Sequence, residues 1–256
     1  MNSQQRMANI VALVVIGVSV LAVPALADCP EFLGSVDTPG SAMGVAVAGG
    51  YAYVADAAPG GLRVINVSTP ASPFEVGYVD TPVTALGVAV SGSYAYVADG
   101  GGGLRVIDVS TPASPFEEGF VDTPSAAYGV AVAGSYAYVA DADSGLRVID
   151  VSTPSMPVEV GFVDTPGQAR GVAVSGSLAY VADRDAGLRV IDVSTPSMPV
   201  AVGLFDTPGW SEGVATASGY VYLADQSDGL AVFLECGLFS DGFESGDTSA
   251  WSATVP

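Results

Sequence analysis

An internal repeat of 42 residues constrains this chain more than any other feature. The segment Gly-Leu-Arg-Val-Ile-(Asn/Asp)-Val-Ser-Thr-Pro recurs at a fixed step, and a degenerate fifth copy follows at the same step. The leucine of each copy marks the period: Leu62, Leu104, Leu146, Leu188 and Leu230. Self-similarity at one period predicts a stack of equivalent units, each of which buries its apolar faces against its neighbours.

Each repeat contains four short apolar segments. In order they are Gly-Val-Ala-Val, an aromatic-rich run that ends in Asp, the Leu-Arg-Val-Ile segment, and a run that ends in Asp-Thr-Pro. Val, Ile, Tyr and Phe are typical of strands, and turns rich in Gly, Ser and Pro separate the four runs. Four strands in each of five repeats, here named a, b, c and d in chain order, predict an all-β fold, a five-bladed β-propeller.

The two ends of the repeat array predict how the ring closes. A lone d-type strand, residues 32–37, precedes the first repeat, and the last repeat, residues 213–235, lacks its d strand. We therefore expect residues 32–36 to pair with residues 231–234 and to complete the last blade, because closure removes open strand edges. Cys29 and Cys236 align with the two flanks of the missing c–d turn, so we expect a disulfide between them at this joint.

The first 27 residues have the pattern of a Sec-type signal peptide. Arg6 precedes an apolar run over residues 10–23, and Ala25-Leu26-Ala27 fits a signal-peptidase site. The sequence thus predicts a signal at 1–27, a propeller at 28–236 and an acidic tail at 237–256 that is flexible or related to sorting. We expect a secreted protein, extracellular or at the cell surface, with the periplasm as the alternative and without membrane insertion after signal cleavage.

The repeat also resembles a known family. Gly-Val-Ala-Val, Tyr-Val-Ala-Asp and Gly-Leu-Arg-Val-Ile-Asp-Val-Ser-Thr-Pro are similar to the LVIVD repeats of bacterial and archaeal extracellular proteins, over about residues 31–236. The resemblance implies a β-propeller. It implies no particular activity, because the family's functions are mostly unknown and a fold alone does not give a function.

Composition excludes several kinds of chemistry. The chain has no His and no Lys, which excludes a Ser-His-Asp triad, a His-based zinc site and a lysine Schiff base. A formal net charge of −20 makes nucleic acid an unlikely partner. We therefore expect a protein that is not an enzyme and has no cofactor; a glycoside hydrolase that uses two carboxylates is the alternative.

Two sets of repeated charges have structural or metal-binding interpretations. Each c strand of the first four repeats begins with an arginine, and we expect these arginines to pair with the Asp of strand d or with the Asp of strand b: Arg63, Arg105, Arg147 and Arg189. The b–c turns of the third and fourth repeats contain closely spaced aspartates that are weak calcium candidates. They are Asp141, Asp143, Asp183 and Asp185.

The d–a loops differ most among otherwise similar repeats. In the first two repeats they carry small or apolar residues, whereas in the last three they carry aromatic and hydrogen-bonding residues: Tyr128, Gln168, Arg170, Trp210 and Glu212. Trp, Tyr and Arg are typical anchors of binding sites, and aromatic rings also stack on sugars. The sequence predicts a monomeric binding module with a protein or carbohydrate ligand on the face of these loops. A multivalent, lectin-like ring with one site per blade is the alternative.

Overall fold

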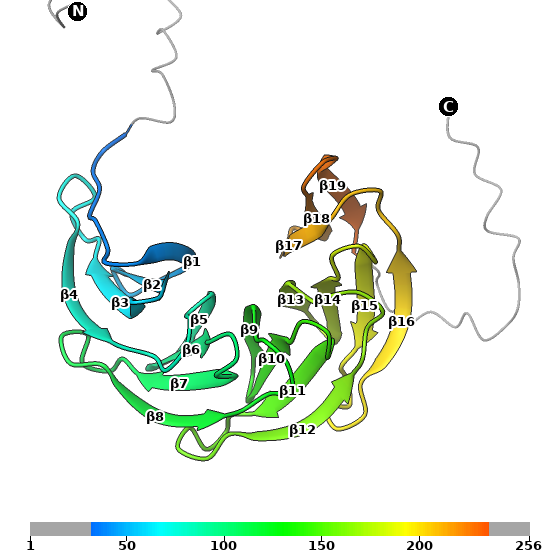
Figure 1. Ribbon diagram of the computed structural model, residues 1–256, viewed down its shortest axis with the longest axis horizontal. Helices are drawn as coiled ribbons and strands as arrows, with labels where there is room; N and C mark the ends of the chain where they lie inside the picture. The colour runs from blue at the N-terminus through cyan, green and yellow to red at the C-terminus, as the bar shows by residue number, and fades with distance from the viewer. Residues whose placement is uncertain (1–31, 236–256) are drawn as a thin grey trace, which may run out of the picture. The chain divides into compact units, whose positions relative to one another are not determined.

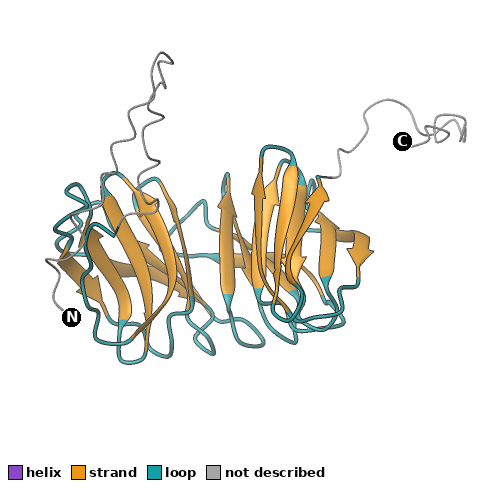
Figure 2. Cartoon of the chain, turned by 90° about the horizontal axis from the view of Figure 1, so that it is seen from above, coloured by secondary structure: helices purple, strands orange, loops and turns teal. Residues whose placement is uncertain are grey.

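The computed structural model describes residues 32–235, and they form an all-β fold of nineteen strands without helices (Figure 2). In this part of the chain no helix is long and apolar enough to cross a membrane. The proposed signal peptide, both cysteines and the tail at 237–256 lie outside the described residues, so the predicted disulfide remains a prediction.

The strands form five antiparallel sheets, one for each repeat, and these are the blades of a five-bladed β-propeller. Strand a lies innermost in each blade (Figure 1) and is β1 (Ser41–Ala48), β5 (Gly87–Ser91), β9 (Gly129–Ala133), β13 (Gly171–Ser175) or β17 (Ser211–Ala217). Strand b is β2 (Tyr51–Ala57), β6 (Tyr94–Ala98), β10 (Tyr136–Ala140), β14 (Leu178–Ala182) or β18 (Tyr220–Asp225).

The outer half of each blade consists of strands c and d. Strand c is β3 (Gly61–Asn66), β7 (Leu104–Asp108), β11 (Leu146–Asp150), β15 (Leu188–Asp192) or β19 (Gly229–Leu234). Strand d is β4 (Phe74–Val79), β8 (Phe116–Val121), β12 (Val158–Val163) or β16 (Val200–Phe205). The first four blades have the order a-b-c-d, and the fifth has three strands in the described part of the chain. The predicted fold class is thus confirmed.

The hydrophobic core lies between blades. Leu62 and Val64 of β3 pack against Val97 of β6 and Ile107 of β7, and the clusters between the following blades repeat this arrangement. Both faces of the strands are therefore apolar, and each blade depends on its neighbours for burial.

One glycine in strand d lets consecutive blades approach closely. A Cβ on Gly77 of β4 would lie 2.4 Å from the carbonyl oxygen of Pro112, in the c–d turn of the next blade. Gly119 and Gly161 have equivalent contacts with the turns at Pro154 and Pro196. The c–d turn of one blade thus rests on the bare backbone of the preceding blade.

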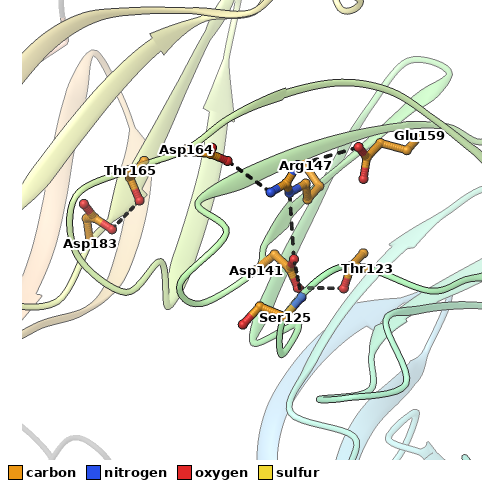
Figure 3. A network of polar contacts seen from close by, with 8 residues as sticks. All are labelled: Thr123, Ser125, Asp141, Arg147, Glu159, Asp164, Thr165 and Asp183. Carbon is orange, nitrogen blue, oxygen red and sulfur yellow. Dashed lines mark hydrogen bonds and ion pairs between the residues drawn. The ribbon is translucent and has the colours of Figure 1, made fainter.

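A buried aspartate at the end of strand b joins each blade to the preceding d–a loop. In the third blade, Asp141 accepts a hydrogen bond of 2.6 Å from the Thr123 hydroxyl and one of 3.0 Å from the Ser125 backbone N–H (Figure 3). The equivalent threonine hydroxyls, Thr38, Thr81 and Thr165, donate to Asp56, Asp99 and Asp183. The Asp-Thr-Pro motif is therefore a link between blades.

The repeated arginines pair with both of the expected partners. Arg147 lies 3.8 Å from Asp141 of strand b and 3.1 Å from Asp164 after strand d, and it also reaches Glu159 at 3.7 Å (Figure 3). Its guanidinium stacks on Phe162 at 4.6 Å from the ring centroid. Arg63 and Arg105 repeat the arrangement. The structural interpretation of these residues is confirmed.

The predicted pairing of residues 32–36 with residues 231–234 is wrong for this structure. Residues 32–40 form no strand, and β19 pairs with β18 alone. The physical reason is the missing cross-strand pair, because Ala231 and Ser35 occupy the positions at which Arg63 of β3 stacks on Tyr78 of β4. Residues 34–40 still contact the first blade. Thr38 Oγ1 and the Gly40 N–H both donate to Asp56 at 2.8 Å, and Gly34 packs on the turn at Pro70 as Gly77 packs on Pro112. The segment takes the position of a preceding d strand, but its c-strand partner is absent.

The strand-d glycines give a matched test of the blade contact. We expect Gly77→Ala to lower the free energy of unfolding by about 1–3 kcal/mol, the usual cost of overpacking, because the new methyl meets backbone that cannot move away easily. Gly203→Ala at the same repeat position should have a small effect, since its nearest neighbour is the Val190 side chain at 3.4 Å. Chemical denaturation measures both; equal effects would contradict this account.

Removal of a repeated arginine should leave a buried charge without compensation. We expect Arg105→Ala to destabilise the fold by about 3–5 kcal/mol, because the fully buried Asp99 loses its cation. Arg170→Ala is the control, since no carboxylate of the described residues lies within ion-pair distance of Arg170. Thermal denaturation of the two variants compares them, and a control that unfolds as early as Arg105→Ala would refute the assignment.

Candidate functional site

A column of glycines brings the variable loop residues together. A Cβ on Gly129 would lie 2.7 Å from the Arg170 carbonyl oxygen, and Gly87 and Gly171 have similar contacts with the next blade. Because the inner strands start this close to one another, the residues that precede these glycines form a row: Met43, Leu86, Tyr128, Arg170 and Glu212. This packing explains why side chains about 42 residues apart in sequence become neighbours.

Three of the predicted site residues form a stacked and hydrogen-bonded group. The Arg170 guanidinium lies 3.8 Å from the centroid of the Tyr128 ring, a cation–π contact. Arg170 also donates to Gln168 Oε1 at 3.0 Å, and the Gln168 amide donates to Asp143 at 2.8 Å. The b–c turn of the third blade and the next d–a loop thus share one network.

The other two predicted residues lie around Arg184, which the sequence analysis did not select. The Arg184 guanidinium lies 4.1 Å from the centroid of Trp210 and donates a short hydrogen bond to Gln168. Its Nε lies 3.9 Å from Glu212, which accepts a 3.0 Å hydrogen bond from Gln226. Arg184 therefore connects the two halves of the predicted site.

The backbone places Arg184 in this position. Arg184 and Ser211 exchange two backbone hydrogen bonds of 3.1 and 3.0 Å, which hold the b–c turn beside the loop that carries Trp210. Arg184 has φ of 43°, and Gly100 occupies the same turn position in the second blade with φ of 52°. An arginine at a repeat position that holds glycine in the second repeat is the sequence signal that could have identified the residue, because glycine tolerates the positive φ of this turn best.

Gln168, Arg184 and Trp210 line a cavity of about 410 Å³ on the face of the d–a and b–c loops, whereas Tyr128, Arg170 and Glu212 are not among its walls. Its walls are Asp143, Pro166, Gly167, Gln168, Arg184, Asp185 and Trp210. Trp210 remains about half exposed there. The cavity thus combines an accessible aromatic surface with charged and amide groups that accept and donate hydrogen bonds.

Arg170 and Arg184 differ electrostatically from the four repeated arginines. Each repeated arginine lies near two or more carboxylates. By contrast, Arg184 has a single distant partner, and within residues 32–235 no carboxylate reaches Arg170. The two arginines with the least neutralised charge in the described structure therefore lie at the same site.

The calcium candidates do not converge on one point. Asp141 accepts from Thr123 and lies beside Arg147, whereas Asp143 accepts from Gln168. Burial raises the pKa of Asp183 above its ordinary value, while hydrogen bonds from Thr165 and Gly167 and the nearby Arg189 act in the opposite direction. Among the residues that the structure describes, no group of three or more acidic side chains is arranged to hold a metal ion.

Comparison with known proteins gives the family. The model of the LVIVD repeat matches five consecutive segments, residues 39–81, 84–123, 125–165, 166–207 and 208–233. The chain belongs to the LVIVD repeat family. The matched segments cover most of the chain and coincide with the five blades, so the resemblance read from the sequence is confirmed.

Solved structures add information on the fold alone. The chain is similar to the computationally designed Ika4 protein, with a TM-score of 0.53 and 12% identity over 64% of this chain and 99% of that one. It is also similar to the computationally designed Ika8 protein, with a TM-score of 0.56 and 11% identity over 80% of this chain and 74% of that one. No curated protein matches the chain.

Proposed function

We propose that this LVIVD repeat protein is an exported, non-catalytic binding module whose single ligand site is the cavity between Gln168, Arg184 and Trp210. The observation that carries the proposal is that Gln168 and Trp210, selected by their variation among the repeats, meet Arg184 of a third loop around one cavity with an exposed aromatic ring. Export rests on the signal-peptide pattern of residues 1–27.

A carbohydrate fits this cavity best among the expected ligands. The Trp210 ring offers an apolar surface for the C–H face of a sugar, and Asp143, Asp185 and Arg184 offer acceptors and donors for its hydroxyl groups. Aromatic anchors combined with fixed polar groups are typical of small-ligand sites. A protein segment that inserts an aromatic or acidic side chain is the remaining ligand class from the sequence analysis.

The same geometry favours one site over one site per blade. The positions of Gln168 and Arg170 are occupied by Ser41 and Met43 in the first blade, and by Thr84 and Leu86 in the second. These loops lack the charged and aromatic groups that line the cavity. A multivalent ring therefore receives less support than a single site.

Catalysis also receives less support than binding. The carboxyl group with a raised pKa, Asp183, takes part in the repeated link between blades and does not line the cavity. A glycoside hydrolase needs two carboxylates at a defined separation, one of them poised as an acid. Release of reducing sugar from a bound glycan would favour hydrolysis over simple binding.

Substitution of the aromatic anchor tests the proposal. An array of neutral and acidic oligosaccharides identifies a binding glycan, and isothermal titration then measures its Kd and stoichiometry. We expect one site per chain and a loss of affinity of about tenfold or more for Trp210→Ala, because truncation of a central aromatic anchor typically costs at least 1–2 kcal/mol. Arg184→Ala should weaken binding in the same way.

The matched control is Thr84→Ala, at the repeat position of Trp210. It should leave both Kd and melting temperature unchanged. Binding of five glycans per chain would favour the multivalent alternative. If no oligosaccharide binds, or if Trp210→Ala and Arg184→Ala bind the glycan normally, this site is not a carbohydrate site.

A further inference from the structure

The outer part of the fourth blade departs from the repeat at two positions of strand d. In each of the first three blades the residue of strand d that lies opposite the repeated arginine is aromatic: Tyr78, Phe120 and Phe162. In β16 this position holds Leu204, opposite Arg189. Ala201 of β16 replaces a glutamate that precedes the aromatic residue in the other three blades: Glu75, Glu117 and Glu159. The fourth blade therefore lacks two large side chains.

In the third blade both of these side chains contact the repeated arginine. The Arg147 guanidinium stacks on Phe162 at 4.6 Å from the ring centroid, and its Nη1 lies 3.7 Å from Glu159 (Figure 3). Arg105 has the same two kinds of partner. The repeated arginine thus accepts an aromatic face and a further carboxylate in addition to its two aspartates.

Arg189 keeps the two aspartates but has small or aliphatic residues at the other two places. Its Nε lies 3.6 Å from Asp183, and its Nη2 lies 3.0 Å from Asp206. Ala201 carries no charge, and Leu204 carries no aromatic face. The Arg189 side chain is 11% exposed, against 6–8% for the other three repeated arginines. Arg189 therefore has the environment of its counterparts without one carboxylate and one ring.

A cavity of about 510 Å³ lies at this place. Its walls include Arg189, Ile191, Ala201 and Leu204 of the fourth blade, and residues 163–166 at the end of the third. Ile191 belongs to the core between these two blades, so the cavity lies in an inter-blade groove and away from both ends of the array. Its volume is within the range of about 300–1,000 Å³ that is typical of small-molecule sites.

The two missing groups define the chemistry of a ligand. We propose that this cavity binds a small aromatic carboxylic acid. The ring of the acid stacks on the Arg189 guanidinium as Phe162 stacks on Arg147, and its carboxylate pairs with Arg189 as Glu159 pairs with Arg147. Cation–π stacking and an arginine–carboxylate pair are both strengthened by partial burial, which the groove provides.

This site is separate from the glycan site of the proposed function. The two cavities share only Pro166 among their walls, and Trp210 and Arg184 do not line the inter-blade cavity. The glycan and the acid therefore bind different residues. Glycan affinity is an independent measurement, so the failure of one proposal is distinguishable from the failure of the other.

The first experiment uses 3-phenylpropionate as the probe for the full chain. Isothermal titration should show one site per chain for this acid. The uncharged 3-phenylpropanamide and the ringless propionate should each bind about tenfold more weakly or worse, because each lacks one of the two groups that contact Arg189. Absence of binding by the acid, or equal affinity for the acid and the amide, would overturn the proposal.

The second experiment restores the residues of the third blade. A double variant, Ala201→Glu with Leu204→Phe, should fill the cavity with the protein's own side chains and lose the acid while its melting temperature stays the same or rises. Val200→Phe is the matched control, since Phe74 and Phe116 occupy this position in other blades and Val200 does not line the cavity. Its affinity for the acid should be unchanged.

The single variant Ala201→Glu separates the carboxylate from the ring. It should abolish the preference for 3-phenylpropionate over 3-phenylpropanamide, because the new glutamate takes the place of the ligand's carboxylate beside Arg189. Normal binding of the acid by the double variant, or equal loss of binding in Val200→Phe, would show that the acid binds elsewhere and would overturn the assignment.

Discussion

The buried aspartate at the end of strand b is the interaction on which the rest of this structure depends. Asp141 receives a hydroxyl and a backbone N–H from the preceding d–a loop, and a guanidinium lies beside it on strand c (Figure 3). A buried carboxylate is stable only when its charge and lone pairs are compensated. The two hydrogen-bond donors and the guanidinium come from different segments, so one side chain holds strand b, strand c and the inter-blade loop together.

The repeated link between blades allows the residues at the loop tips to vary. The link needs only Asp, Thr and a backbone N–H, and the close contact of inner strands needs only glycine. Positions next to these, such as Arg170 and Trp210, take no part in that link, and the residues there differ in every blade. The same hydrogen bonds recur in the blades, while each blade carries different side chains at its loop tips. A repeat protein can form one asymmetric site in this way.

The same repetition makes each blade depend on a neighbour for burial. Each blade is built to have a neighbour on both sides, because Leu62 and Val64 in one blade need Val97 and Ile107 in the next. Terminal units of open repeat arrays have polar outer faces, whereas the fifth blade keeps apolar residues at these positions. Leu230 is exposed in the described structure, whereas Leu62, Leu104, Leu146 and Leu188 at the same repeat position are buried.

The sequence alone determined the fold class, the strand boundaries within a residue or two, the structural role of the arginines and the loops that carry variation. These follow from local patterns repeated five times, in which each copy confirms the others. The closure of the ring did not follow, because Ala231 and Ser35 replace the arginine and aromatic residue that stack between strands c and d in the first three blades. Only the tertiary structure brought Arg184 between Gln168 and Trp210, since that contact depends on a positive φ and on backbone pairing between blades.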